Sequence, residues 1–167
     1  MALQDTKKPI LIFEHQAFDA AFQALYDSGM SLIEETAAYI DGEGVLASRQ
    51  LSGEASSLYA SEAMRISTRL MQVASWLLLM RAGREKEMPE DQISNEKAKV
   101  SLNTPSDQTT AVWQELPKTF RDLVNRSLRL EERVRHLDID LTLLMENGSE
   151  NSVNDQLNRI KSAFSHH

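Results

Sequence analysis

Apolar residues recur at alternating spacings of four and three along three long stretches, as in helices that pack against other helices. The first stretch begins at about Gln16 and ends at Asp41-Gly-Glu-Gly44, where we expect a glycine in the left-handed conformation to end the helix. The second runs over residues 54–83. The third begins at Leu116-Pro117, ends at Asn147-Gly-Ser149 and carries the repeat Leu116, Phe120, Leu123, Ser127, Leu130, Val134, Leu137, Leu141 and Leu144.

The middle stretch carries two neighbouring lines, so more than half of its circumference favours burial and the helix is expected to be central. Arg69 interrupts this apolar surface. It is either a long stem over the core with its head in solvent or on a carboxylate, or a buried ion pair that fixes helix register. The two lines are Tyr59, Ala63, Ile66, Leu70, Val73, Leu77 and Met80, and Ala60, Met64, Ser67, Met71, Ala74 and Leu78.

Three helices of matched length predict an all-α fold, an antiparallel up-down-up three-helix bundle. We expect an N-terminal arm at residues 1–15, the bundle at 16–147 with a polar loop at about 88–112, and a tail at 148–167. The connector at 45–53 is short, which favours antiparallel neighbours. The polar loop is long, and long polar loops are either mobile or functional.

The second apolar line of the middle helix has no partner in a lone bundle. Burying each of its large side chains stabilises the protein by roughly 1.5–3 kcal/mol. A homodimer packed through this face removes it from water in the simplest way, since two-fold pairing is the commonest oligomer. The alternative is that the loop and tail cover it. The face is defined by Met64, Met71, Ala74 and Leu78.

The tail also has apolar residues at helical spacing, although a one-face helix of this length is marginal alone. It is either a docked terminal helix or a segment that orders on a partner. The predicted partner-binding residues of the tail are Val153, Leu157, Ile160 and Phe164.

Composition narrows the functional classes. The chain has 167 residues, a net charge of −7 and no Cys, which excludes a thiolate zinc site and fits a reducing cytoplasm. The longest apolar run, residues 73–80, is too short to cross a bilayer, so no membrane insertion is expected. The third helix carries a basic set, Lys118, Arg121, Arg126, Arg129, Arg133 and Arg135, interleaved with acidic residues. This pattern favours a solvated mixed-charge face over a nucleic-acid footprint.

Candidate chemistry is sparse. Glu132, His136 and Asp140 share one helix line, but a metal site there would need a ligand from another helix, and an exposed charged face is favoured. We find no Ser-His-acid grouping, no phosphate-binding glycine loop and no paired Glu-x-x-His motif. We therefore expect no catalytic residue, no metal and no cofactor.

The block SEAMRISTRLMQVASWLLLMRA at residues 61–82 is preceded by AAYIDGEG and followed by a third helix that Leu116-Pro117 begins. With these features the chain closely resembles the alphaproteobacterial RcdA family, regulators of CtrA degradation. The resemblance implies a dimeric three-helix bundle with a mobile C-terminal tail. It also implies a non-enzymatic adaptor of the ClpXP protease that helps deliver the response regulator CtrA, together with CpdR and PopA, in the cytoplasm or at a cell pole. The alternative is a structural or nucleic-acid-associated helical protein that uses the Arg-rich face.

Overall fold

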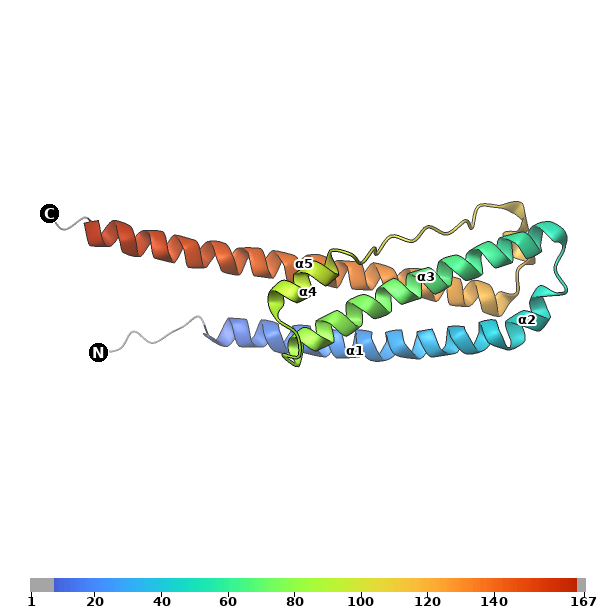
Figure 1. The fold of residues 1–167 in the computed structure, drawn as a ribbon, viewed down its shortest axis with the longest axis horizontal. Helices are drawn as coiled ribbons and strands as arrows, with labels where there is room; N and C mark the ends of the chain where they lie inside the picture. Colours follow the sequence, from blue (N-terminus) through green and yellow to red (C-terminus); the bar gives the residue numbers. More distant parts are fainter. Residues whose placement is uncertain (1–7, 165–167) are drawn as a thin grey trace. The chain divides into compact units, whose positions relative to one another are not determined.

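The computed structural model describes the backbone of residues 8–164 and the side chains of residues 18–143. All regular structure within residues 8–164 is helical, which confirms the all-α prediction (Figure 1). The elements are α1 (Lys8–Asp41), α2 (Glu43–Ser48), α3 (Gly53–Arg84), α4 (Glu90–Lys97), the short 3₁₀ helix η1 (Ala111–Glu115) and α5 (Lys118–Phe164).

The chain divides into two compact units, Met1–Glu132 and Arg133–His167, and the division falls within α5. The contacts described below lie within the first unit. Residues beyond 132 are discussed only as positions along α5. The domain boundaries predicted at residues 15 and 147 stay predictions.

The central helix α3 begins where the sequence predicts. Ser52 lies at its N-terminus in an extended conformation, and its side-chain oxygen accepts a hydrogen bond from the N–H of Ala55 at 3.3 Å. Such a bond satisfies one of the N–H groups that the first turn leaves without a partner. The first apolar line faces the core, since six of its members are buried: Tyr59, Ile66, Leu70, Val73, Leu77 and Met80.

Aromatic contacts show how the three long helices run. Phe22, in the first half of α1, lies 6.2 Å between ring centroids from Trp76, near the end of α3. Tyr39, near the end of α1, and Tyr59, near the start of α3, both lie against Phe120, so α1 and α3 are antiparallel. Phe120, in the first turn of α5, lies 6.3 Å from Tyr39 near the end of α1. The same ring lies 4.4 Å from Tyr59, near the start of α3, so α3 and α5 begin at the same end.

The predicted up-down-up order is therefore wrong, because α5 begins parallel to α3 and antiparallel to α1 (Figure 1). The reason is the connection. Residues 98–110, which we call the strap, connect α4 to η1. After a turn at residues 98–99, the strap returns along α3 as an extended segment (Figure 1). Ser101 is bonded to Gln72 and Asp107 is bonded to Glu62, so a step of six residues along the strap corresponds to a step of ten residues along α3. Ten helical residues rise about 15 Å, and six extended residues span up to about 20 Å, so a short strap can cover a long stretch of helix.

Helix ends also differ from the sequence expectation. The α1 helix begins at Lys8 instead of about Gln16, and α5 continues through Asn147-Gly-Ser149 as far as Phe164. A helix-interior glycine costs only about 1 kcal/mol relative to alanine, so this triplet weakens a helix without ending it.

The predicted left-handed glycine at the end of α1 is also wrong. Gly42 has a φ of −115°, and the described glycines have no positive φ. The left-handed position follows α3 instead, where Lys86 has a φ of 56° and the N–H of Glu87 donates to the carbonyl of Ala82 at 2.9 Å. This is the hydrogen-bond pattern that glycine usually supports at a helix C-terminus.

Gly44 serves close packing. It is buried, and a Cβ added there would lie 2.5 Å from the hydroxyl oxygen of Tyr59 and 2.8 Å from the carbonyl oxygen of Tyr39. We expect Gly44→Ala to lower the free energy of unfolding by about 1–3 kcal/mol, the usual cost of overpacking. Gly53→Ala is the control, because nothing lies within 4 Å of a Cβ at that position. Urea unfolding measures both variants, and equal midpoints would contradict this role of Gly44.

Candidate docking surfaces

Arg69 is fully buried and connects α3, α5 and the strap. One guanidinium nitrogen, Nη1, donates to the hydroxyl of Ser127 at 2.9 Å. The other, Nη2, donates to the backbone carbonyls of Thr104 at 2.9 Å and Pro105 at 3.2 Å. Its Nε lies 3.6 Å from a carboxylate oxygen of Glu131 and has no hydrogen-bond partner. The sequence left two readings of Arg69 open, and the structure shows the buried ion pair.

Two buried carboxylates hold the strap on either side of Arg69. Glu62 accepts from the hydroxyl of Ser106 at 2.7 Å and from the N–H of Asp107 at 2.9 Å. Glu131 accepts from the N–H of Thr104 at 3.0 Å. Arg65 also donates to Glu62 at 2.6 Å. Gln72 accepts a further strap hydrogen bond, from the N–H of Ser101 at 2.9 Å. We call the four side chains that bond the strap, Glu62, Arg69, Gln72 and Glu131, the strap site.

The charges of the strap site are balanced. Burial lowers the pKa of the Arg69 guanidinium, while the carboxylates of Glu131 and Glu62 act in the opposite direction. With Arg65, two cations face two carboxylates. Buried ions cost several kcal/mol each in desolvation unless they are paired and hydrogen-bonded. The strap supplies backbone donors and acceptors that complete this pairing, so the helices and the strap depend on each other.

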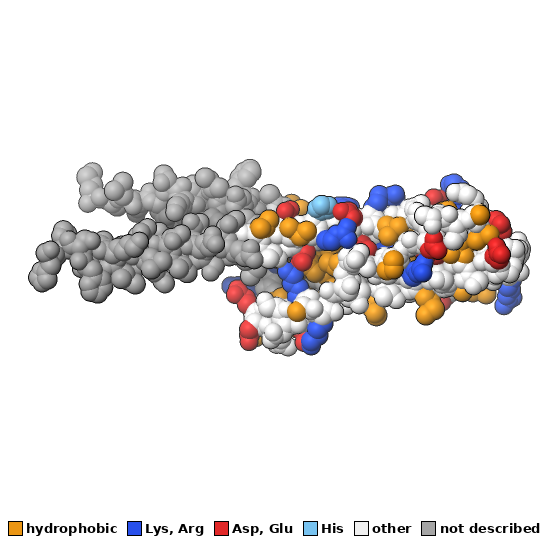
Figure 2. Space-filling view, turned by 90° about the horizontal axis from the view of Figure 1, so that it is seen from above, with side chains coloured by type: hydrophobic (Ala, Val, Ile, Leu, Met, Phe, Trp, Pro, Cys, Tyr) orange, Lys and Arg blue, Asp and Glu red, His pale blue; other side chains and the backbone are white. Residues whose placement is uncertain are grey.

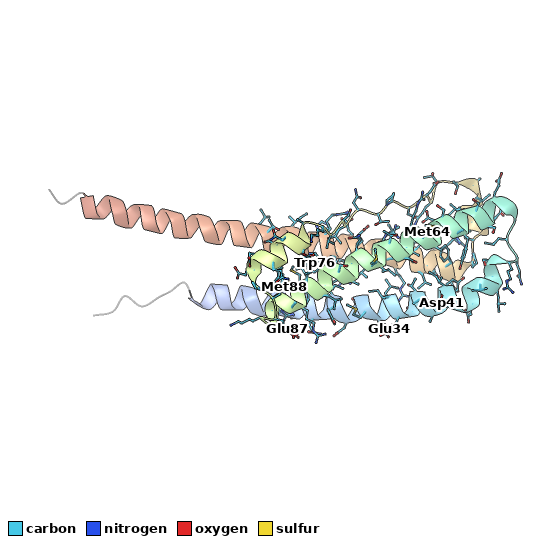
Figure 3. All side chains as sticks on the ribbon, in the orientation of Figure 1. Glu34, Asp41, Met64, Trp76, Glu87 and Met88 are labelled. Atoms are coloured by element: carbon cyan, nitrogen blue, oxygen red, sulfur yellow. The ribbon has the colours of Figure 1, made fainter. Side chains whose placement is uncertain are left out.

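The outer face of α3 is the second surface. The predicted residues Met64, Met71 and Leu78 are 74%, 59% and 51% exposed, and Ala74 is half-buried. In Figure 3, Met64 and Trp76 are both labelled on α3, and Trp76 belongs to the opposite, buried side. An exposed apolar line of this length on a helix is typical of an interaction surface.

Charged side chains are missing from this outer face. Between Ala55 and Met80, α3 has three charged residues, Glu62, Arg65 and Arg69; two of these are buried and Arg65 is bonded to Glu62. Two hydroxyls on the outer face, those of Ser67 and Ser75, donate to carbonyls of the preceding helical turn, at 2.8 and 2.9 Å. The outer face therefore carries no charged side chain, and its two serine hydroxyls are bonded to the backbone of α3 itself. An uncharged face of this kind is unusual in a chain with 26% charged residues.

Three of the six residues of the basic set of α5, Lys118, Arg121 and Arg126, bond to acceptors. Arg126 makes two hydrogen bonds of 2.7 Å to the carboxylate of Glu35, and these bonds lower the pKa of Glu35. Lys118 pairs with Asp122 at 3.3 Å, and Arg121 donates to Gln114 at 2.6 Å. On the face shown in Figure 2, basic and acidic side chains are interspersed. This arrangement supports the solvated mixed-charge reading over a nucleic-acid footprint.

An open hollow of about 780 Å³ lies beside α1 and the end of α3. Arg81 donates to the hydroxyl of Tyr26 at 2.8 Å, and its hydrogen bonds to Glu85 and Tyr26 raise its pKa. Arg84 pairs with Asp19 at 3.0 Å. Because Arg81 and Arg84 are held by the acidic and aromatic walls of the hollow, we assign no ligand to it. Its lining is Asp19, Phe22, Gln23, Tyr26, Asp27, Arg81, Arg84, Glu85 and Lys86.

Other predicted residues fall elsewhere. The side chains of Val153, Leu157, Ile160 and Phe164 lie outside the described side chains, although the α5 backbone includes all four positions. Among the described residues, no group of three or more His, Asp or Glu is arranged to hold a metal ion. None of the described helices combines the length and the apolar character that a membrane span requires.

No role was predicted from the sequence for Glu62, Gln72 or Glu131. A signal was present, because Glu62 and Arg69 are seven residues apart and therefore share one side of α3. A polar line at the edge of the buried side indicates that something polar packs there. The polar segment that follows α4 was the natural candidate.

The fold and surfaces thus define an all-helical protein with an exposed, uncharged helix face. The family model described as "Protein of unknown function (DUF1465)" matches residues 13–164, and the chain belongs to that family. The structure is similar to the crystal structure of RcdA from Caulobacter crescentus CB15, with 47% sequence identity and a TM-score of 0.58. The match covers 70% of this chain and 87% of that chain, which confirms the predicted resemblance to the RcdA family. No curated protein matches the chain.

Removal of the Arg69 charge tests the strap site. We expect Arg69→Met to lower the free energy of unfolding by about 3–5 kcal/mol, because two buried carboxylates lose their common cation. Arg126→Met is the control, since its pair with Glu35 is about half exposed and such pairs contribute about 0–1 kcal/mol. Chemical unfolding followed by circular dichroism measures both. Losses of similar size in the two variants would contradict the assigned role.

Proposed function

We propose that the protein is a non-enzymatic adaptor that resembles RcdA and helps deliver the response regulator CtrA to the ClpXP protease in cell-cycle control. The observation that carries this proposal is the 47% identity to RcdA over 87% of that chain. The proposal includes CpdR and PopA as partners and a cytoplasmic location, either throughout the cytoplasm or at a cell pole. An adaptor needs docking surfaces and no reactive pocket, because it acts by raising the effective concentration of a client near the protease.

We propose further that the adaptor is a homodimer that pairs through the outer face of α3. The centres of protein interfaces are depleted of charged residues and enriched in Met, and this face has both properties. A second copy is the occupant that fits best, because the face is self-complementary under a two-fold axis.

The self-complementarity lies in the order of large and small residues. Large side chains at positions 64, 71 and 78 alternate with small ones at 60, 67 and 74. In an antiparallel pair centred at position 69, each large residue faces a small one: Met64 faces Ala74, Met71 faces Ser67, and Leu78 faces Ala60 of the second copy. Facing large and small residues interdigitate without voids. A parallel pair would instead place large residues against large ones.

Met71→Asp tests the dimer. We expect a folded monomer, because a charge at the centre of the face must be desolvated in the pair and stays in water in the monomer. Leu46→Asp is the matched control, since Leu46 is also exposed but lies on α2. Sedimentation velocity gives the mass of each variant. A Met71→Asp protein of unchanged mass refutes pairing through this face.

The orientation of the pair has its own test, since the chain contains no Cys. A mixture of Ala60→Cys and Leu78→Cys proteins should form a mixed disulfide dimer if the helices are antiparallel. A parallel pair would instead yield Ala60→Cys dimers from that variant alone.

We also propose that the C-terminal part of α5 binds a partner. Ile139 and Leu143 are exposed, and positions 153, 157, 160 and 164 lie in the same four-three register, with Glu146 and Glu150 at the two positions between. On a continuous helix these positions share one face. The continuation of α5 to Phe164 keeps this spacing in register. The proposed partner-binding residues remain Val153, Leu157, Ile160 and Phe164.

A reconstituted degradation assay with ClpXP, CtrA, CpdR and PopA tests the adaptor role. We expect the protein to increase the rate of CtrA loss, and deletion of residues 148–167 to slow it because the partner-binding segment is removed. Deletion of residues 165–167 alone is the control, since α5 ends at Phe164. A rate that does not depend on the protein would refute the adaptor role. A rate that survives the longer deletion would refute only the role of the segment.

A further inference from the structure

The strap is bound mainly through its backbone. Three of its N–H groups donate to side chains of the strap site, and two of its carbonyls accept from Arg69. Four side chains from α3 and α5 therefore hold five backbone groups of one extended segment. The strap groups are the N–H of Ser101, Thr104 and Asp107 and the carbonyls of Thr104 and Pro105.

Recognition of this kind depends little on sequence, because every residue except proline has the same backbone groups. The strap site tolerates a proline at position 105, because only the carbonyl of that residue is bonded, to Arg69, and no N–H is needed there. A proline also favours the extended conformation before binding, which lowers the entropy that binding must overcome. The hydroxyl of Ser106 adds one side-chain bond, to Glu62. The site thus fits an extended segment with a proline followed by a hydroxyl residue.

The strap is a replaceable occupant on two grounds. Its residues are exposed or half-buried, and none is buried, so little apolar area holds it in place. It also leaves the buried Nε of Arg69 without a hydrogen-bond acceptor. A buried, unsatisfied donor costs about 1–3 kcal/mol, so an occupant that supplies an acceptor there would bind better than the strap.

We propose that the strap site is a binding site for an extended segment of a partner protein, containing a proline and a hydroxyl residue, and that such a segment displaces residues 101–107. This inference does not depend on which client the protein serves. It gives the first unit a docking site separate from the outer face of α3 and from the end of α5.

A labelled peptide of residues 100–109 is the probe, and fluorescence anisotropy measures its binding. Wild-type protein should bind it weakly, because the strap competes at high local concentration. Replacement of residues 102–106 by five glycines weakens the strap through its entropy and through loss of the bond from Ser106 to Glu62, and it leaves the strap site intact. We expect this glycine variant to bind the peptide about tenfold more tightly than wild type.

The side chains of the site are tested in the same glycine variant. Gln72→Ala removes the acceptor of the Ser101 N–H and should weaken peptide binding several-fold. Ser67→Ala is the matched control on the outer face of α3, since its hydroxyl bonds only the carbonyl of Ala63 and should leave binding unchanged. Equal affinity of wild type and the glycine variant, or equal effects of the two alanine substitutions, overturns the proposal.

If the glycine variant does not fold, Ser106→Gly replaces it, because this change removes only the bond to Glu62 from the strap. Hydrogen exchange then gives the second readout. Saturating peptide should accelerate exchange of the Thr104 and Asp107 N–H groups, which leave their carboxylates, and should leave the α3 amides unchanged. Exchange of the strap amides that does not change with peptide overturns the proposal equally.

Discussion

The arrangement of the first unit depends on one buried cation. Arg69 reaches the strap, α5 and a carboxylate at once, from the middle of α3. The strap has few apolar side chains, so hydrophobic burial cannot hold it against the helices. Its backbone groups must be bonded instead, and charged partners form stronger hydrogen bonds than neutral ones. The parallel course of α3 and α5 requires a long return connection, and Arg69 with its two carboxylates fixes that connection in place.

The helices could be predicted because their apolar spacing repeats over many turns, and the contact of Tyr59 with Phe120 follows from that spacing. The direction of α5 could not. Spacing along one helix is the same in both directions, and direction was inferred from an expected economy of connections. The deciding information lay in Glu62, Gln72 and Glu131, whose role becomes apparent only when the strap is beside them.

The candidate surfaces likewise include residues that could be predicted from the sequence and residues that could not. Met64, Met71 and Leu78 were predicted from sequence because an apolar line without a partner is visible in the spacing itself, and the structure leaves them exposed. Arg69 was undecidable, since a long cationic side chain can reach solvent from many core-facing positions. The tail positions are placed on a continuous helix by the backbone of α5, beyond the glycine that was expected to end it.

The strap is fixed at both ends of its central section, by Gln72 at Ser101 and by Glu62 at Asp107. Surface connections usually tolerate insertions and deletions. Here one added or lost residue between these two bonds would shift every backbone group away from its side chain. Among relatives with the same side chains at the strap site, this segment should therefore vary in sequence while it keeps its length, as a helix or strand does and a loop does not.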